Sequence, residues 1–119
     1  MPREKLRAKS ADLLQGTLGI LILKALFAGP AHGYGIARWV EHVAADVLRI
    51  EEGSLYPALR RLADRGWVTS EWGLSENNRR ARYYTITDAG RQHLRTEAAT
   101  WLRFAGAVTQ VLRVEPSLA

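Results

Sequence analysis

Apolar side chains recur at helical spacing in the first part of the chain. Between Leu13 and Ala28 they cover so much of the helix circumference that we expect this helix to be buried on more than one face. The pair Gly29-Pro30 ends it, because proline cannot continue the helical hydrogen-bond ladder. A second helix is predicted from about Gly33 to Ala44, with Ile36 and Val40 on its buried side.

The segment from Glu52 to Gly66 combines an apolar stripe with a basic opposite face. Pro57 has no amide N–H to donate, so the helix must begin only a few residues earlier, between Glu52 and Leu55. Gly66 stands where a left-handed C-cap would end it. A short connector, 47–50, should precede it, extended over 48–50. The stripe consists of three leucines spaced i, i+4 and i+7, namely Leu55, Leu59 and Leu62.

Two strands should follow this third helix. The segment from Trp67 to Trp72 has the alternation and composition of a strand, and a second strand is predicted from Ala81 to Ile86. The residues between them, 73–80, form a polar turn with a basic end. A helix followed by a hairpin with a basic tip is the arrangement of a winged helix-turn-helix.

The last helix is predicted from Asp88 to about Val114, with Thr87-Asp88 as its N-cap. Its apolar residues repeat every three or four positions over roughly 40 Å, at 1.5 Å per residue. A small winged domain cannot cover that length, so we expect a homodimer; the alternative is a helix folded back wholly onto its own domain. The first helix would contribute its second apolar face to the dimer interface. The predicted dimerisation residues are Leu14, Leu18, Leu21, Leu94, Ala98, Trp101, Leu102, Ala105, Val108 and Leu112.

The length of 119 residues suits one domain with an appendage. We therefore predict a mainly α-helical protein with a small β-hairpin. Its parts would be a basic N-terminal arm (1–12), a winged helix-turn-helix domain (13–87) and a C-terminal dimerisation helix with a tail (88–119).

The charge balance is 17 Lys and Arg against 12 Asp and Glu, a formal net charge of +5. This excess suits a polyanionic partner, although a solvated basic surface would have the same composition. The chain has no cysteine, which excludes disulfides and cysteine zinc sites. The apolar run from Leu18 to Phe27 is interrupted by Lys24 and is shorter than the roughly 20 residues of a membrane span, so a cytoplasmic protein is the simplest interpretation.

No pattern of catalytic or metal-binding residues emerges from the sequence. His32 has neither His42 nor His93 at the i, i+4 spacing that helical metal ligands favour. There is no supported Ser-His-Asp arrangement and no glycine-rich phosphate loop. We therefore expect no enzyme, no metal and no cofactor, and we interpret His32, Gly33 and Tyr34 as structural.

The third helix supplies the first set of predicted DNA contacts. An α-helix fits the major groove, where arginine can donate two hydrogen bonds to guanine, so Arg60 is the expected base contact and Arg61 a base or phosphate contact. Near the helix start, Ser54 and Tyr56 suit phosphate oxygens or base edges, although Tyr56 could instead pack against the second helix. Pro57 projects from the same exposed side and completes the predicted DNA-binding set on this helix.

The turn of the hairpin supplies the second set. Basic side chains there suit phosphate or minor-groove contacts, with plain solubility as the alternative. The residues are Asn78, Arg79, Arg80 and Arg82.

A small-molecule site is a further candidate. Trp101 falls in the middle of the apolar seam, where two copies related by a two-fold axis could present facing indole planes to a planar aromatic effector. The alternative is that Trp101 only buries its indole in the interface.

Four segments of the chain resemble the PadR-like family of bacterial transcriptional regulators. They are Leu13 to Leu18, Gly29 to Ile36, Glu52 to Leu62 and Arg82 to Gly90, of which the block Leu55-Tyr56-Pro57-Ala58-Leu59 is the most specific. The resemblance implies a dimeric winged helix-turn-helix repressor whose C-terminal helix mediates dimerisation. With one such helix the chain looks like the short class. Relatives often respond to small molecules that are frequently aromatic, but the resemblance leaves the effector open.

Two-fold symmetry would match such a dimer to a palindromic operator in double-stranded DNA. A winged helix that binds another protein or RNA would share the fold. Salt-dependent binding to a palindromic duplex, compared with a random one, would separate these classes.

Overall fold

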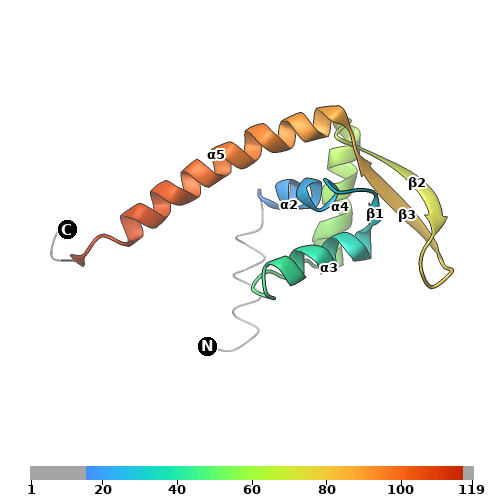
Figure 1. The fold of residues 1–119 in the computed structure, drawn as a ribbon, viewed down its shortest axis with the longest axis horizontal. Coiled ribbons are helices and arrows are strands. Elements are labelled where there is room, and N and C mark those ends of the chain that lie inside the picture. Colours follow the sequence, from blue (N-terminus) through green and yellow to red (C-terminus); the bar gives the residue numbers. More distant parts are fainter. Residues whose placement is uncertain (1–15, 117–119) are drawn as a thin grey trace.

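The computed structural model describes residues 16–116, which form four helices and three strands (Figure 1). The order along the chain is α2 (Leu18–Ala25), β1 (Ala31–His32), α3 (Gly33–Val43), α4 (Glu52–Asp64), β2 (Val68–Leu74), β3 (Arg80–Ile86) and α5 (Asp88–Leu112). The β2–β3 hairpin, here called the wing, projects at one end of the molecule, and α5 extends away at the other (Figure 1).

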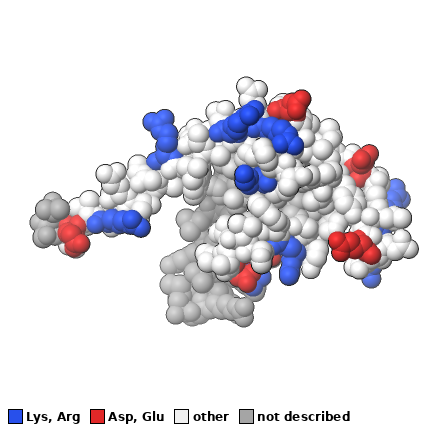
Figure 2. All heavy atoms as spheres, viewed as in Figure 1, with Lys and Arg blue, Asp and Glu red and all other residues white. Residues whose placement is uncertain are grey.

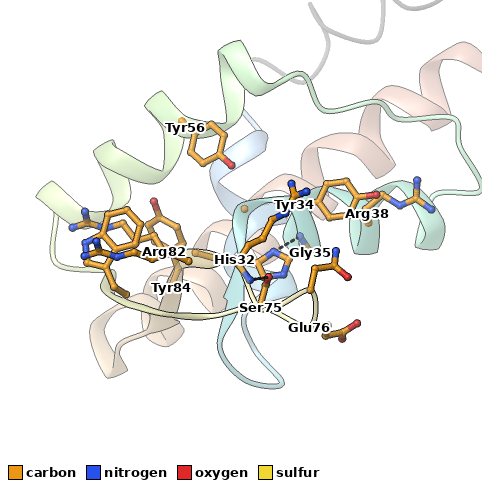
Figure 3. A pocket seen from close by; sticks show the side chains of 15 residues that line it. His32, Tyr34, Gly35, Arg38, Tyr56, Ser75, Glu76, Arg82 and Tyr84 are labelled. Atoms are coloured by element: carbon orange, nitrogen blue, oxygen red, sulfur yellow. Dashed lines mark hydrogen bonds between the residues drawn. The ribbon is translucent and has the colours of Figure 1, made fainter.

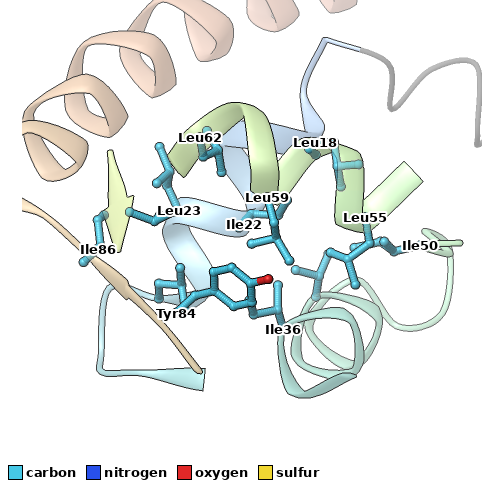
Figure 4. Close-up of a cluster of buried hydrophobic side chains, with 14 of the residues drawn as sticks. Leu18, Ile22, Leu23, Ile36, Ile50, Leu55, Leu59, Leu62, Tyr84 and Ile86 are labelled. Carbon is cyan, nitrogen blue, oxygen red and sulfur yellow. The ribbon is translucent and has the colours of Figure 1, made fainter. Parts of the chain in front are cut away.

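Helix α2 lies at the centre of the hydrophobic core. It packs against α3, α4 and α5, which explains why its apolar residues occupy so much of its circumference. Ile22, Leu23 and the adjoining Leu26 are fully buried (Figure 4). Leu55, Leu59 and Leu62 of α4 pack into the same cluster, as their spacing predicted.

The first helix differs from its predicted bounds. Within the described residues it begins at Leu18, and the predicted start at Leu13 falls outside them. It ends at Ala25 rather than Ala28, because the chain tightens ahead of Gly29-Pro30: Phe27 N–H donates to Lys24 O at 3.1 Å, an i−3 bond.

The sheet has one strand more than the predicted hairpin. β1 pairs antiparallel with β3, with Ala31 opposite Tyr84 and His32 opposite Tyr83, so the strand order is β1-β3-β2. Both hairpin strands extend further toward the tip than predicted. β2 ends at Leu74 instead of Trp72, and β3 begins at Arg80 instead of Ala81. β1 was missed because two residues are too few to show the alternation of a strand.

The ends of α4 follow the local rules. It begins at Glu52, within the predicted range, and Pro57 lies inside the helix in its second turn. Gly66 adopts a left-handed φ of 77°, and the Gly66 and Trp67 amides bond to Ala63 O and Leu62 O, which is a Schellman motif. The preceding connector, 47–50, is irregular, and Ile50 N–H donates to the Glu41 carboxylate at 3.0 Å.

The start of α5 is locked to the corner that follows α4. The Thr87 hydroxyl accepts a hydrogen bond from Gly90 N–H and donates one to Gly66 O at 2.7 Å, so Thr87 is the predicted N-cap. Gly90 packs so closely that a Cβ there would overlap the Trp67 carbonyl oxygen. The next turn buries Leu94, whereas beyond Ala98 the helix leaves the core.

Candidate nucleic-acid interface

Helix α4 presents three different sides to its surroundings. Successive residues turn by about 100°, so Pro57 and Arg60 project opposite the buried leucine stripe and are exposed. Tyr56 lies on the flank that faces the wing. Ser54 and Arg61 lie on the other flank, so Arg60 and Arg61 do not point in the same direction.

A hollow of about 820 Å³ separates α4 from the wing, with the N-terminal part of α3 as its third wall (Figure 3). Four arginines and one glutamate line it, together with aromatic side chains from all three walls. Its charged and aromatic residues are His32, Tyr34, Arg38, Tyr56, Trp72, Glu76, Arg79, Arg80, Arg82 and Tyr84. A cationic hollow beside an exposed helix face can hold a polyanionic backbone next to that helix.

Tyr56 connects α4 to α3 at the edge of this hollow. A Cβ on Gly33 would lie only 2.8 Å from the Tyr56 hydroxyl oxygen, so the ring packs over the glycine as the alternative interpretation expected. The side chain is still 46% exposed. Burial, with Glu52 and Tyr84 nearby, raises the pKa of Tyr56 above its usual value, so the phenol stays neutral and can donate to an anion.

The wing directs two arginines toward the hollow. The strand register pairs Trp72 with Arg82 and Leu74 with Arg80 on one face of the hairpin. At the base of the hairpin the same face carries Val68, Tyr84 and Ile86, which are buried in the core. Both guanidinium groups lie over the Trp72 ring, Arg80 at 4.5 Å and Arg82 at 5.5 Å from its centroid. Arg82 Nε also donates to Ser70 Oγ at 2.8 Å.

A tight turn at 75–79 joins the two strands. Ser75 N–H donates to Arg79 O, and Arg79 N–H donates to the Ser75 hydroxyl at 3.3 Å. Asn78 takes a left-handed φ of 59°, a conformation that asparagine tolerates better than most residues. The turn therefore holds Asn78 and Arg79 at the tip of the wing, where both are exposed.

Sequence reasoning missed the contribution of α3 to the hollow. Tyr34 is 67% exposed and, with Arg38 one turn later, points away from the buried side of α3. The Arg38 guanidinium lies 5.9 Å from the Tyr34 ring. His32 is structural, as predicted, since its Nδ1 accepts a hydrogen bond from Gly35 N–H at 3.0 Å and caps the helix. The spacing of Tyr34 and Arg38, an aromatic residue and an arginine at i and i+4, was the sequence signal that could have indicated this exposed face of α3.

A second, smaller hollow of about 580 Å³ lies on the other flank of α4, between α2 and α5. Arg61 and Arg65 line it with Trp67 and His93, whose rings stack with centroids 3.5 Å apart. The structure therefore separates Arg61 from Arg60 and from the wing. Its role as a base contact stays a prediction, and this position suits a phosphate on the far side of the helix.

The predicted dimerisation residues fall into two groups. Leu18 and Leu94 are buried in the protomer's own core, Leu21 and Ala98 pack against it, and Leu14 lies outside the described residues. The others lie on the part of α5 beyond the core, where Trp101 is 42% exposed. Exposed neighbours not in the prediction widen this apolar surface: Phe104, Val111 and Val114.

On the face that Figure 2 shows, charge alone does not outline a binding surface. Figure 2 shows basic side chains over the wing and at intervals along α5, mixed with acidic ones. Within residues 16–116 no three histidine, cysteine or acidic side chains group as metal ligands. No helix in that part of the chain has the length and apolarity to cross a bilayer.

A model of the transcriptional regulator PadR-like family matches residues 22–96, which span α2 to the first turns of α5 and include α4 and the wing. The chain belongs to the PadR-like family. Members of the PadR-like family are transcriptional regulators rather than enzymes, so the exposed face of α4 and the hollow belong to a winged helix-turn-helix regulator.

Relatives of this PadR-like chain include proteins of different lengths. An uncharacterized protein in a transposon of Streptomyces fradiae is 39% identical over 89 residues, 75% of this chain and 24% of that protein. The negative transcriptional regulator PadR of Bacillus subtilis is 29% identical over 73 residues, 61% of this chain and 40% of PadR. The chain thus spans less than two thirds of either protein.

Solved structures share the fold. A PadR family transcriptional regulator from Eggerthella lenta superposes with a TM-score of 0.73 and 31% identity, over 94% of this chain and 96% of that one. Bacillus subtilis PadR, solved in complex with operator DNA, superposes with a TM-score of 0.61 and 27% identity, over 69% of this chain and 47% of PadR.

Proposed function

We propose that this PadR-like regulator binds a palindromic operator in double-stranded DNA as a homodimer and represses transcription from it. The observation that carries the proposal is the exposed Pro57 and Arg60 face of α4 beside a hollow with four arginines. Bacillus subtilis PadR is a negative regulator solved with its operator, which supports the same activity here.

Each wall of this interface has a distinct task. Arg60 enters the major groove with α4 and donates to guanine O6 and N7. Arg79 and Arg80 on the wing contact phosphates or the minor groove on one side of α4. Arg61 and Ser54 meet the backbone on the other side. The neutral Tyr56 hydroxyl donates to a phosphate from the rim of the hollow.

Dimerisation through the apolar part of α5 completes the operator contact. Two α4 helices related by a two-fold axis meet two half-sites about one helical turn, roughly 34–36 Å, or a multiple of it apart. The predicted basic arm, 1–12, lies outside the described residues, and we propose that it adds non-specific attraction to the backbone. Because its partner is DNA, the protein acts in the bacterial cytoplasm.

Selection of bound sites from random duplexes tests this proposal. We expect an inverted repeat to be enriched, and binding to it should weaken as salt rises. No enrichment of any duplex, or tighter binding to single-stranded RNA in a parallel titration, would show that the winged helix serves another class of partner.

Comparison of two variants on the selected site then separates base contacts from backbone contacts. Arg60→Ala should cost about 1–3 kcal/mol and relax discrimination at one base pair of each half-site. Arg79→Ala with Arg80→Ala should weaken specific and random duplexes alike and flatten the salt dependence. Arg113→Ala, at the exposed C-terminal end of α5, is the control for loss of one positive charge. The reverse pattern would assign sequence recognition to the wing.

An effector would act at the dimer seam. We propose that Trp101, still 42% exposed in the protomer, contributes to a site for planar aromatic compounds, with burial in the interface as its alternative role. In a variant with Trp39, Trp67 and Trp72 replaced by Phe, such compounds should quench the remaining fluorescence. No quenching across a broad panel would leave Trp101 as an interface residue only.

A further inference from the structure

The wing carries one large aromatic side chain that core packing does not explain. Trp72 lies on β2 beyond the buried base of the sheet and is 55% exposed. Exposing an indole to water loses the stabilisation that burying it would provide. Its ring nevertheless has two partners, the guanidinium groups of Arg80 and Arg82 at 4.5 and 5.5 Å from the centroid.

The register of the hairpin explains this grouping. Residues at alternate positions share a face, so Trp72 stands beside Arg82 across the ladder and beside Arg80 on the diagonal. Both arginines therefore reach the same ring from β3. The face that they share lines the hollow between the wing, α3 and α4.

Arg82 is restrained twice. Its Nε donates to Ser70 Oγ at 2.8 Å while its guanidinium carbon lies over the Trp72 ring. The bond uses only Nε–H, and a guanidinium keeps further donors on its two Nη atoms. A guanidinium held in this way has lost much of its rotamer freedom before any anion arrives.

We propose that Trp72 is a positioning residue for DNA binding: its indole holds Arg80 and Arg82 as a preformed cationic pair on the wall of the hollow. The proposal rests on the function proposed above. Ordering a flexible arginine at an interface costs about 2- to 10-fold in affinity, so a preformed pair binds phosphate more tightly than two free side chains. Trp72 thereby acts through the arginines and not by touching DNA.

Replacing the ring by an aliphatic side chain tests the role. Trp72→Leu should weaken operator binding by about 5-fold or more per protomer, whereas the slope of log affinity against log salt should stay unchanged because the same phosphates are contacted. Trp72→Phe should recover part of the loss, since a phenyl face still attracts guanidinium. Trp39→Leu, which removes a similarly exposed indole outside the hollow, should bind as the wild type does.

A double-mutant cycle decides between an indirect and a direct role. In a variant that already carries Arg80→Ala and Arg82→Ala, Trp72→Leu should have no further effect on affinity. A full effect in that background would mean that Trp72 itself contacts DNA, and the positioning role would be wrong.

Two further outcomes keep this inference separate from the proposed function. If the Trp72→Leu variant binds the operator as tightly as the wild type does, the inference is wrong and the proposed regulator function still stands. A wild-type protein that shows no salt-dependent duplex binding would overturn both. Thermal unfolding of Trp72→Leu should resemble that of the wild type, and a large fall in Tm would instead assign Trp72 a role in stability.

Discussion

The two halves of α5 have the same kind of sequence and opposite surroundings. In the first half, Gly90 packs against the Trp67 carbonyl oxygen and Leu94 is 5% exposed. In the second half, apolar residues at the same spacing remain exposed, and Leu112 reaches 78%. A continuous apolar seam thus predicts that a helix face will be buried. It does not predict whether the same chain or a partner chain buries it.

The length of the helix causes this difference. At 1.5 Å per residue, the 25 residues of α5 extend roughly 37 Å, whereas the core that its first half joins ends near Ala98. The molecule is consequently elongated, with principal extents of 59, 35 and 21 Å, and the second half of α5 projects from it (Figure 1). A contiguous apolar surface of this kind is typical of protein interfaces.

The largest expected effect belongs to the tight corner in the first half. Gly90→Ala introduces a Cβ that overlaps backbone and cannot be relieved by a side-chain rotation. We expect a loss of about 4 kcal/mol or more in the free energy of unfolding, measured by urea titration. Gly106→Ala, in open space on the same helix, is the control. Equal stability of the two variants would mean that α5 can move away from Trp67.

The next largest effect concerns Leu94, which is buried in the first half of α5. Leu94→Ala should lower the free energy of unfolding by about 3 kcal/mol, because it opens a cavity in the protomer's core. The loss should not depend on protein concentration. A loss that disappears on dilution would instead place Leu94 in the dimer interface, as the sequence analysis first suggested.

Charged residues in the second half of α5 should weaken the dimer without unfolding the winged domain. Val108→Glu with Leu112→Glu places two carboxylates in the exposed seam. We expect the dimer dissociation constant, measured by sedimentation, to rise by about 30-fold, equivalent to about 2 kcal/mol. Circular dichroism should show an intact winged domain. A dimer of unchanged affinity would move the interface to another surface.

The smallest effect concerns Gly106, which lies in the second half away from the apolar seam. A Cβ there meets nothing within 4 Å in the protomer. Gly106→Ala should therefore raise helix stability by about 0.5–1 kcal/mol, seen as a higher Tm. If the Tm falls and the dimer weakens together, a partner helix approaches Gly106 closely.

The sequence by itself determined the features that depend on neighbouring residues. Gly66 set the C-terminal end of α4, and Thr87 set the start of α5, because caps and turns are satisfied within a few residues. The leucine stripe of α4 predicted its buried side correctly for the same reason. The resemblance to the PadR-like family rests on such local blocks, and the family match confirms it.

Only the tertiary structure decided which distant residues meet. The strand Ala31–His32 exists because β3 offers it an edge to pair with. Tyr34 joins the wing in one hollow because α3 and β3, far apart in the sequence, pack together. Helix geometry alone separates Arg60 from Arg61, but only the packing of α4 against α2 decided that Arg61 lines a hollow with residues of α2 and α5. Leu94 belongs to the core and Val108 to the surface because the domain ends between them, and no periodicity along α5 encodes where a core stops.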